Sequence, residues 1–72
     1  MTAPQLSPVE SSSIAAVGYD AAERILWVRF VNGATYRYRD VPPARYEDFM
    51  RAESKGRYFN SEIRTTYPFT RA

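Results

Sequence analysis

The stretch Ile-Leu-Trp-Val-Arg-Phe-Val-Asn-Gly-Ala-Thr-Tyr-Arg-Tyr-Arg-Asp, at residues 25–40, decides the fold class. Two runs with period-2 alternation flank Asn32-Gly33, and this arrangement is typical of a β-hairpin. The length of the loop decides which side chains share a face of the sheet, because a shift of one residue moves every side chain to the opposite face.

Two loop lengths fit the turn. A two-residue turn would pair Val28 with Arg37 and would mix apolar and charged side chains on one face. A three-residue loop, with Gly33 in the left-handed conformation, would instead pair Val28 with Tyr36. That register gives an apolar face made of Leu26, Val28, Phe30, Tyr36 and Tyr38, and an outer face made of Ile25, Trp27, Arg29, Thr35, Arg37 and Arg39. We favour the three-residue loop because it separates the two kinds of side chain.

The segments around the hairpin complete the fold. We expect a first strand at residues 12–20, with an irregularity near Gly18. Val41-Pro42-Pro43 ends the sheet and starts a helix, because proline is tolerated in the first helical turn. Tyr46, Phe49 and Met50 have helical spacing and would cover the apolar face.

Ser54 can cap a short second helix, in which Gly56 weakens the first turn. The predicted fold class is therefore α+β: a three-stranded antiparallel meander packed against one α-helix, followed by a short second helix.

The 72 residues allow one domain. Residues 1–11 contain Pro4, Pro8 and serines without periodicity, and they are predicted to be a disordered leader. Residues 12–68 form the predicted single domain. Pro68 prevents a regular continuation, so residues 69–72 are predicted to fray.

The composition argues against catalysis. The chain has no histidine and no cysteine, so the common general base, the thiolate nucleophile and the usual transition-metal ligands are missing. We predict no enzyme, no catalytic or metal-binding residues and no cofactor, and we expect no small-molecule substrate. No apolar run approaches a membrane span and no signal peptide is recognisable, so we expect no membrane contact and a cytoplasmic location.

The basic residues are unevenly spread. Residues 24–39 contain four arginines and no acid, although the formal net charge of the chain is only +2. Nine of the ten bases are arginine, the residue better suited to bidentate phosphate contacts and to stacking. The alternative is that arginine merely reflects a GC-rich genome.

Two clusters could bind nucleic acid or an anion. On the outer face, Trp27 should lie opposite Arg37, near Arg29 and Arg39, as a platform for bases and phosphates. The alternative is a solvated face on which arginine stems shield Trp27. The second cluster is Ser54-Lys55-Gly56 with Arg57 at a helix start, where an anion could bind, or which could simply be a capped joint.

The Tyr36/Tyr38 pair is assigned to the core in the favoured register. Were the register wrong, both rings would join Trp27 on the outer face. The hairpin register therefore affects the functional interpretation as well as the fold.

Several motifs resemble a known family. They are Ser-Ser-x-Ile-x-x-x-Gly-Tyr-Asp ending at Asp20, Leu-x-Val-x-Phe-x-Asn-Gly at 26–33, Tyr-x-Tyr at 36–38, Val41-Pro42, and Ser-x-Gly-x-Tyr-Phe-Asn-x-x-Ile-Arg at 54–64. Over about residues 11–68 the chain resembles the KTSC domain, which is named for its place at the C-terminus of some lysyl-tRNA synthetases. The family also occurs as stand-alone bacterial proteins, and the chain resembles these members. The resemblance implies no catalytic residues, and RNA binding has been suggested because of the synthetase association.

These observations lead to one hypothesis and one rival. The hypothesis is a small domain that binds RNA, such as tRNA, weakly and through the backbone. Its candidate residues are Trp27, Arg29, Arg37, Arg39, Lys55, Arg57 and Arg64. The rival is a protein-interaction module without a nucleic-acid role, which would use the same tryptophan or an open sheet edge.

Overall fold

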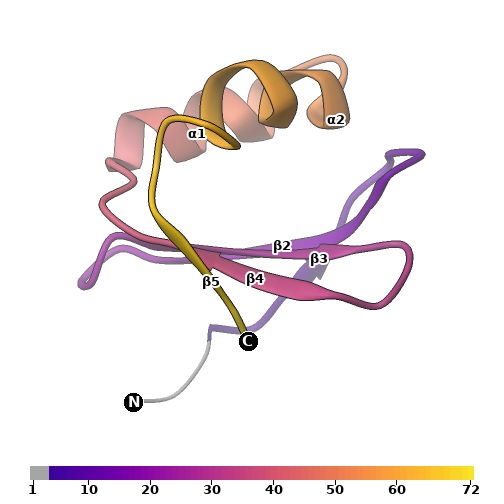
Figure 1. The fold of residues 1–72 in the computed structure, drawn as a ribbon. Helices are drawn as coiled ribbons and strands as arrows, with labels where there is room; N and C mark the ends of the chain where they lie inside the picture. The colour runs from indigo at the N-terminus through magenta and orange to yellow at the C-terminus, as the bar shows by residue number, and fades with distance from the viewer. Residues whose placement is uncertain (1–3) are drawn as a thin grey trace.

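A computed structural model describes residues 4–72 of the chain as one sheet with helices on one side (Figure 1). The strands are β1 (Ser7–Pro8), β2 (Ile14–Asp20), β3 (Ile25–Phe30), β4 (Thr35–Tyr38) and β5 (Phe69–Arg71). The helical segments are α1 (Pro43–Arg51), α2 (Lys55–Tyr58) and η1 (Phe59–Ile63). The strands lie in the order β1-β2-β3-β4-β5, and all neighbours are antiparallel.

The hairpin has the predicted three-residue loop. Val28 pairs with Tyr36, and Trp27 pairs with Arg37. The Phe30 N–H donates to the Ala34 carbonyl at 2.9 Å, and Gly33 has a φ of +94°. Glycine adopts this left-handed conformation without the steric cost of a Cβ atom. The preferred register is therefore confirmed.

The sheet has five strands, so the prediction of three was wrong. Ser7 and Pro8 pair with Val17 and Ala16 at one edge, and β5 pairs with β4 at the other. Both added strands are too short for a visible period-2 pattern, and prolines accompany them. Proline is compatible with an edge strand, where one side of the backbone needs no partner.

These edge strands also change the expected ends of the domain. Residues 4–11 were expected to belong to a disordered leader, but Ser7–Pro8 is a strand and residues 4–6 lie against Gly18. The part of that predicted leader at residues 1–3 lies outside the described residues. Residues 69–71 form β5 in place of the expected frayed end.

The strand irregularity occurs earlier in β2 than predicted. The register with β3 shifts between Ile14 and Ala16, not near Gly18. After the shift, Val17 and Tyr19 pair with Val28 and Leu26. Ile14 and Val17 are three residues apart and would lie on opposite faces of a regular strand, but the register shift allows both to be buried.

Helix α1 begins where the two prolines predicted it. Pro42 is the N-cap, and Pro43 is the first helical residue. Phe49 is fully buried, while Tyr46 and Met50 are half-buried against the core. Ser54 caps α2 as expected, because its hydroxyl accepts the Arg57 N–H at 3.3 Å.

The core lies between the sheet and the helices. Its buried members are Ile14, Val17, Leu26, Val28, Tyr38, Val41, Phe49, Phe59 and Ile63. In η1 the Arg64 N–H donates to the Phe59 carbonyl five residues earlier, and this wider turn ends with both Phe59 and Ile63 buried. Within residues 4–72, no helix combines the length and apolarity needed to cross a membrane.

Candidate nucleic-acid interface

The outer face of the sheet carries the first candidate site. Strand alternation directs Trp27 and Arg29 of β3, together with Thr35 and Arg37 of β4, away from the core. The helices cover only the opposite face of the sheet (Figure 1). Arg39 continues this face, where it lines a shallow depression with Ile25, Arg37 and Thr70. The structure therefore brings Trp27, Arg29, Arg37 and Arg39 together, as the register required.

Trp27 is partly covered. The guanidinium carbon of Arg37 lies 5.4 Å from the centroid of the indole ring, a cation–π contact. Arg37 Nε is buried and has no hydrogen-bond partner among the described residues. Arg29 Nε donates to Thr35 Oγ1 at 3.4 Å. The tryptophan thus supports an arginine and is a poor free stacking platform.

The N-terminal segment covers another part of this face. A Cβ atom at Gly18 would lie 2.7 Å from Leu6 Cδ2 and 3.0 Å from the Gln5 carbonyl oxygen. Because Gly18 pairs with Trp27, residues 4–6 run beside the tryptophan. Pro4 and Leu6 line a depression together with Trp27 and Arg29, whereas Arg37 and Arg39 line a separate one.

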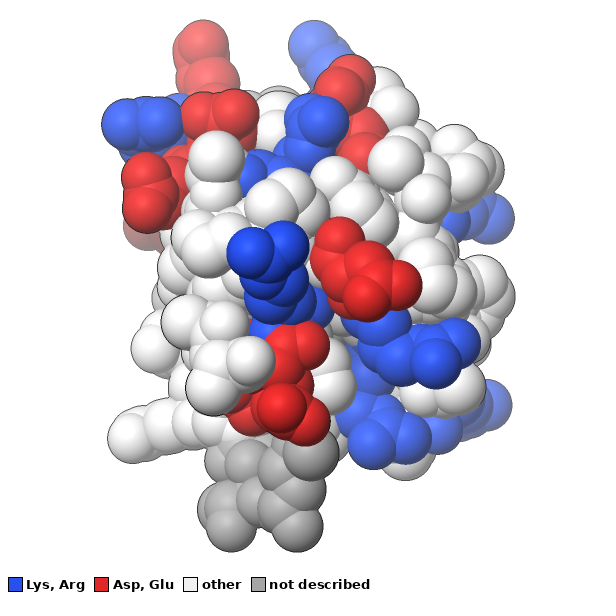
Figure 2. Space-filling view, turned by 90° about the vertical axis from the view of Figure 1, so that its left-hand side faces the viewer, with Lys and Arg blue, Asp and Glu red and all other residues white. Residues whose placement is uncertain are grey.

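Positive charge dominates the outer face. Among the described residues of the five strands, the acid on this face is Asp20, at the end of β2 and paired with Ile25. Its carboxylate accepts the Glu23 N–H in the following turn. Figure 2 views the molecule from the left-hand end of Figure 1. It shows blue groups gathered toward the lower right, with red groups at the lower centre beside them, and both colours across the top, where the helices lie.

The remaining predicted bases lie on the helical side of the sheet. The Lys55 ammonium donates to the Ala52 carbonyl at 3.3 Å. Arg57 borders a hollow beside the serines at 11–13, and Arg64 borders a different groove. The predicted set is therefore divided by the sheet and the core, and it does not form one continuous surface.

The anion candidate Ser54-Lys55-Gly56 lines the hollow with Arg57. A Cβ atom at Gly56 would lie 2.6 Å from Ser13 Oγ, so glycine permits the close approach of the serine segment. The hollow has a volume of about 440 Å³, and Glu10 and Glu53 are also among the residues that line it. These acids offset the two bases, and anion binding here stays a prediction.

Sequence reasoning missed an aromatic groove at the β4–β5 edge. It has a volume of about 490 Å³ and is lined by Phe30, Asn32, Ala34, Tyr36, Tyr38, Phe59, Asn60, Arg64, Thr65 and Phe69. Tyr38 is only 4% exposed, as the core assignment required, but Tyr36 is half-buried and Phe69 is 52% exposed. The strand that brings Phe69 to the groove has three residues, too few to display a period in the sequence.

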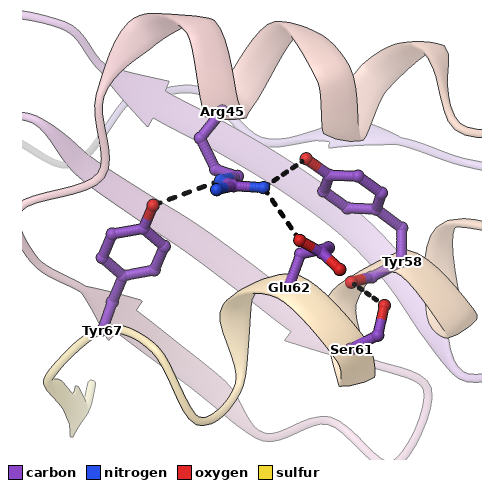
Figure 3. Close-up of polar contacts among 5 residues, drawn as sticks. All are labelled: Arg45, Tyr58, Ser61, Glu62 and Tyr67. Atoms are coloured by element: carbon purple, nitrogen blue, oxygen red, sulfur yellow. Dashed lines mark hydrogen bonds and ion pairs between the residues drawn. The ribbon is translucent and has the colours of Figure 1, made fainter.

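A polar cluster joins α1 to the C-terminal segment (Figure 3). Arg45 donates to the Tyr67 and Tyr58 hydroxyls, each at 3.2 Å, and to Glu62 Oε1 at 3.1 Å. The hydrogen bond to Tyr58 raises the pKa of Arg45 most, and the hydrogen bond to Tyr67 raises it further. Because its guanidinium is already engaged, we assign Arg45 a structural role in holding the helices together.

No cluster of three histidine, cysteine or acidic residues that could hold a metal ion occurs within residues 4–72.

Comparison with known proteins gives the family. Residues 10–67 match the KTSC domain. A protein of Tsukamurella paurometabola is 50% identical over 62 residues, which cover 86% of this chain and 92% of that protein. A lysine–tRNA ligase of Nostoc punctiforme is 38% identical over 66 residues, which cover 92% of this chain but 12% of the ligase.

A solved structure has the same fold. The crystal structure of a KTSC domain protein from Yersinia pestis superposes with a TM-score of 0.91 at 39% sequence identity, and the match covers 97% of this chain and 99% of that one. With residues 10–67 matched as well, the chain belongs to the KTSC domain family.

Proposed function

We propose that this chain is a small RNA-binding domain that contacts the RNA backbone through the outer face of its sheet. The phosphate ligands are Arg29, Arg37 and Arg39. Trp27 contributes by supporting Arg37, not by stacking on bases. The partner that we propose is a structured RNA such as tRNA.

The observation that carries this proposal is the placement of three arginines on the face that the helices leave free. Among the described strands, the acid on this face is Asp20, at the end of β2. Arginine presents a fork of donors that matches phosphate oxygens. Residues two apart on a strand are separated by about 6.6 Å, so Arg37 and Arg39 can engage different phosphates. A patch of this kind binds the backbone without reading the sequence.

The position of Trp27 favours backbone contacts over base recognition. Its ring already interacts with the Arg37 guanidinium at 5.4 Å, and residues 4–6 run beside it. The indole therefore orients an arginine whose Nε–H has no acceptor among residues 4–72. A phosphate that approaches this arginine would meet a side chain whose position is already restricted.

The relatives suggest the kind of RNA. Two lysine–tRNA ligases, from Nostoc punctiforme and another Nostoc strain, contain a stretch similar to 92% of this chain. That stretch is 12% of each ligase, so the ligase activity itself does not transfer to this chain. A domain carried by an enzyme that acts on tRNA is consistent with a tRNA partner.

The test is a titration of isotope-labelled protein with unmodified tRNA, followed by amide shifts at two salt concentrations. We expect shifts at Trp27, Arg29, Arg37 and Arg39. With about three neutralised phosphates, the affinity should fall about 40-fold between 50 and 200 mM salt. The charge-removing variant Arg37→Gln should lower the salt slope by about one, while Arg51→Gln on α1 should leave it unchanged.

Two outcomes would redirect the proposal. Shifts confined to Lys55, Arg57 and their neighbours would move the interface to the helical side. The absence of shifts both on the outer face and at residues 54–64 at low salt would end the RNA proposal. Capture of a protein that resists nuclease and salt would then favour the interaction module.

A further inference from the structure

We propose that the aromatic groove at the β4–β5 edge holds one unpaired nucleotide of the bound RNA, with Arg64 on its phosphate. This inference rests on the proposed RNA-binding function and adds a second contact on the opposite face of the sheet. The groove comprises the aromatic residues Phe30, Tyr36, Tyr38, Phe59 and Phe69, with Asn60 and Arg64 at its polar side.

The groove is built from three separate parts of the chain. The hairpin provides Phe30 and Tyr36, η1 provides Phe59, and β5 provides Phe69. The ring centroids of Tyr36 and Phe69 are 5.7 Å apart, and those of Phe30 and Tyr36 are 5.8 Å apart. The rings meet at tilted or edge-on angles, so they form walls that face an open space of about 490 Å³. Ligand pockets commonly have volumes of this order.

The exposure of Phe69 sets this groove apart from the core. Phe69 is 52% exposed, and among the described residues Val31 is the other large hydrophobic side chain with such exposure. Phe69 nevertheless lies in a strand opposite Tyr38, with a ring centroid 5.5 Å from that tyrosine. An ordered aromatic ring that remains half in solvent offers one face to a planar ligand.

Asn32 Oδ1 in the groove lining accepts the Ala34 N–H at 3.0 Å, but Tyr36, Tyr38, Asn60 and Arg64 have side-chain polar groups without a hydrogen-bond partner among the described residues. The ion pairs of the described residues join Arg45 to Glu62 and Arg51 to Asp48, so the guanidinium of Arg64 is in neither. The hydroxyls of Tyr36 and Tyr38 and the amide of Asn60 make no hydrogen bond with a described residue. No acid lines the groove. The charge and the donors therefore suit a ligand with an anionic group.

An unpaired nucleotide combines the features that this lining requires. Its base can stack on aromatic rings, and its edge can accept or donate hydrogen bonds to Asn60 and the phenols. Its phosphate can pair with Arg64. The groove and the outer face border the same edge strand, because Phe69 faces the groove while Thr70 lies beside Arg37 and Arg39. An RNA strand that crosses β5 could reach both.

The experiment uses the full chain and four probes: adenosine 5′-monophosphate, adenosine, ribose 5-phosphate and tRNA. Trp27 is the single tryptophan and lies outside the groove, so its fluorescence reports the outer face separately. Adenosine 5′-monophosphate should shift the aromatic resonances of Phe30, Tyr36 and Phe69 and leave Trp27 emission unchanged. Adenosine should bind about 10-fold more weakly, and ribose 5-phosphate should produce no groove shifts.

Two variants test the assigned roles. Phe69→Ala should lower the affinity for adenosine 5′-monophosphate about 10-fold. Val31→Ala, at the other exposed large hydrophobic side chain, should leave this affinity unchanged. Arg64→Gln should remove the preference for the nucleotide over adenosine, and Arg51→Gln should retain it. Unchanged unfolding midpoints would confirm that these exposed substitutions leave the fold intact.

The outcomes separate the two proposals. If tRNA quenches Trp27 but the mononucleotide shifts no groove resonance, the groove proposal fails while the outer-face function stands. If the mononucleotide binds in the groove but tRNA affects neither Trp27 nor the outer-face amides, the RNA function fails, and with it the claim that the nucleotide belongs to an RNA. Equal affinity of wild type and Phe69→Ala for adenosine 5′-monophosphate would also contradict the proposal that the groove binds a nucleotide.

Discussion

Leu26 and Trp27 are neighbours in β3, yet they serve opposite sides of the molecule. Leu26 is fully buried under the helices, whereas Trp27 lies on the face that the helices leave uncovered. The inner face was predictable as core because its side chains are aliphatic or aromatic, and burial of such surface stabilises the fold. The outer face tolerates arginine, since water can solvate the charge there. Predictions that contrast the two faces test this division of roles.

The largest contrast concerns stability. Leu26→Ala removes a fully buried side chain and leaves a cavity, so it should lower the free energy of unfolding by about 3 kcal/mol. Arg29→Ala, three residues along the same strand on the outer face, should change it by less than about 0.5 kcal/mol. Urea unfolding followed by circular dichroism measures both. Equal losses would mean that the outer face also stabilises the fold.

The second contrast concerns the tyrosine hydroxyls of the inner side. The Tyr19 hydroxyl donates to the Val41 carbonyl, whereas that of Tyr38 has no such partner in the described chain. Tyr19→Phe should therefore cost about 1 kcal/mol, and Tyr38→Phe less than about 0.5 kcal/mol. The same unfolding experiment compares them. A larger loss in Tyr38→Phe would mean that its hydroxyl has a partner that the described contacts omit.

The third prediction concerns the cover of the outer face. In Gly18→Ala the new methyl group would lie 2.7 Å from Leu6 Cδ2 and 3.0 Å from the Gln5 carbonyl oxygen. The Leu6 side chain must therefore turn aside, and we expect the packing of residues 4–6 on the sheet to loosen. Trp27 emission should then shift to the red, and the amides of residues 5–8 should exchange faster. Leu6→Ala should produce a similar red shift without a change in the strand. An unchanged spectrum in both variants would place the segment away from Trp27.

The smallest expected effect is an alkaline loss of stability. Burial is the main cause that raises the pKa of Tyr38, and the neighbouring Tyr36 adds to it. The positive charge of Arg64 acts in the opposite direction. A raised pKa means that the folded state binds the phenolic proton more tightly than the unfolded state does. This contribution is complete below about pH 10 and is lost as the pH rises through the folded pKa.

Unfolding free energies measured between pH 9 and pH 11.5 check this sign. The loss should be smaller in Tyr38→Phe than in wild type. Removal of the opposing charge in Arg64→Gln should raise the pKa of Tyr38 further, as followed by its ring resonances. A fall in that pKa would contradict the placement of Arg64 near the phenol.

The sequence predicted the elements with strong local signals. The alternation in residues 25–38 and Gly33 defined the hairpin register, and Pro42-Pro43 defined the start of α1. The edge strands escaped prediction because two or three residues cannot display a period. The position of the β2 irregularity also escaped, since a bulge depends on how both strands pack against the core.

The candidate site was predictable in part for the same reason. Strand alternation alone placed Trp27, Arg29, Arg37 and Arg39 on one face. It could not relate Lys55, Arg57 or Arg64 to that face, because their positions depend on how the helices dock on the sheet.

The amino-acid sequence by itself thus determined the α+β class, the hairpin register and the arginines of the outer face, because these follow from local periodicity and turn geometry. The tertiary structure decided that the sheet has five strands, that Trp27 supports Arg37, and that Phe69 completes a groove with Phe30 and Tyr36. These features join residues far apart in the chain, and no local pattern specifies how such segments meet.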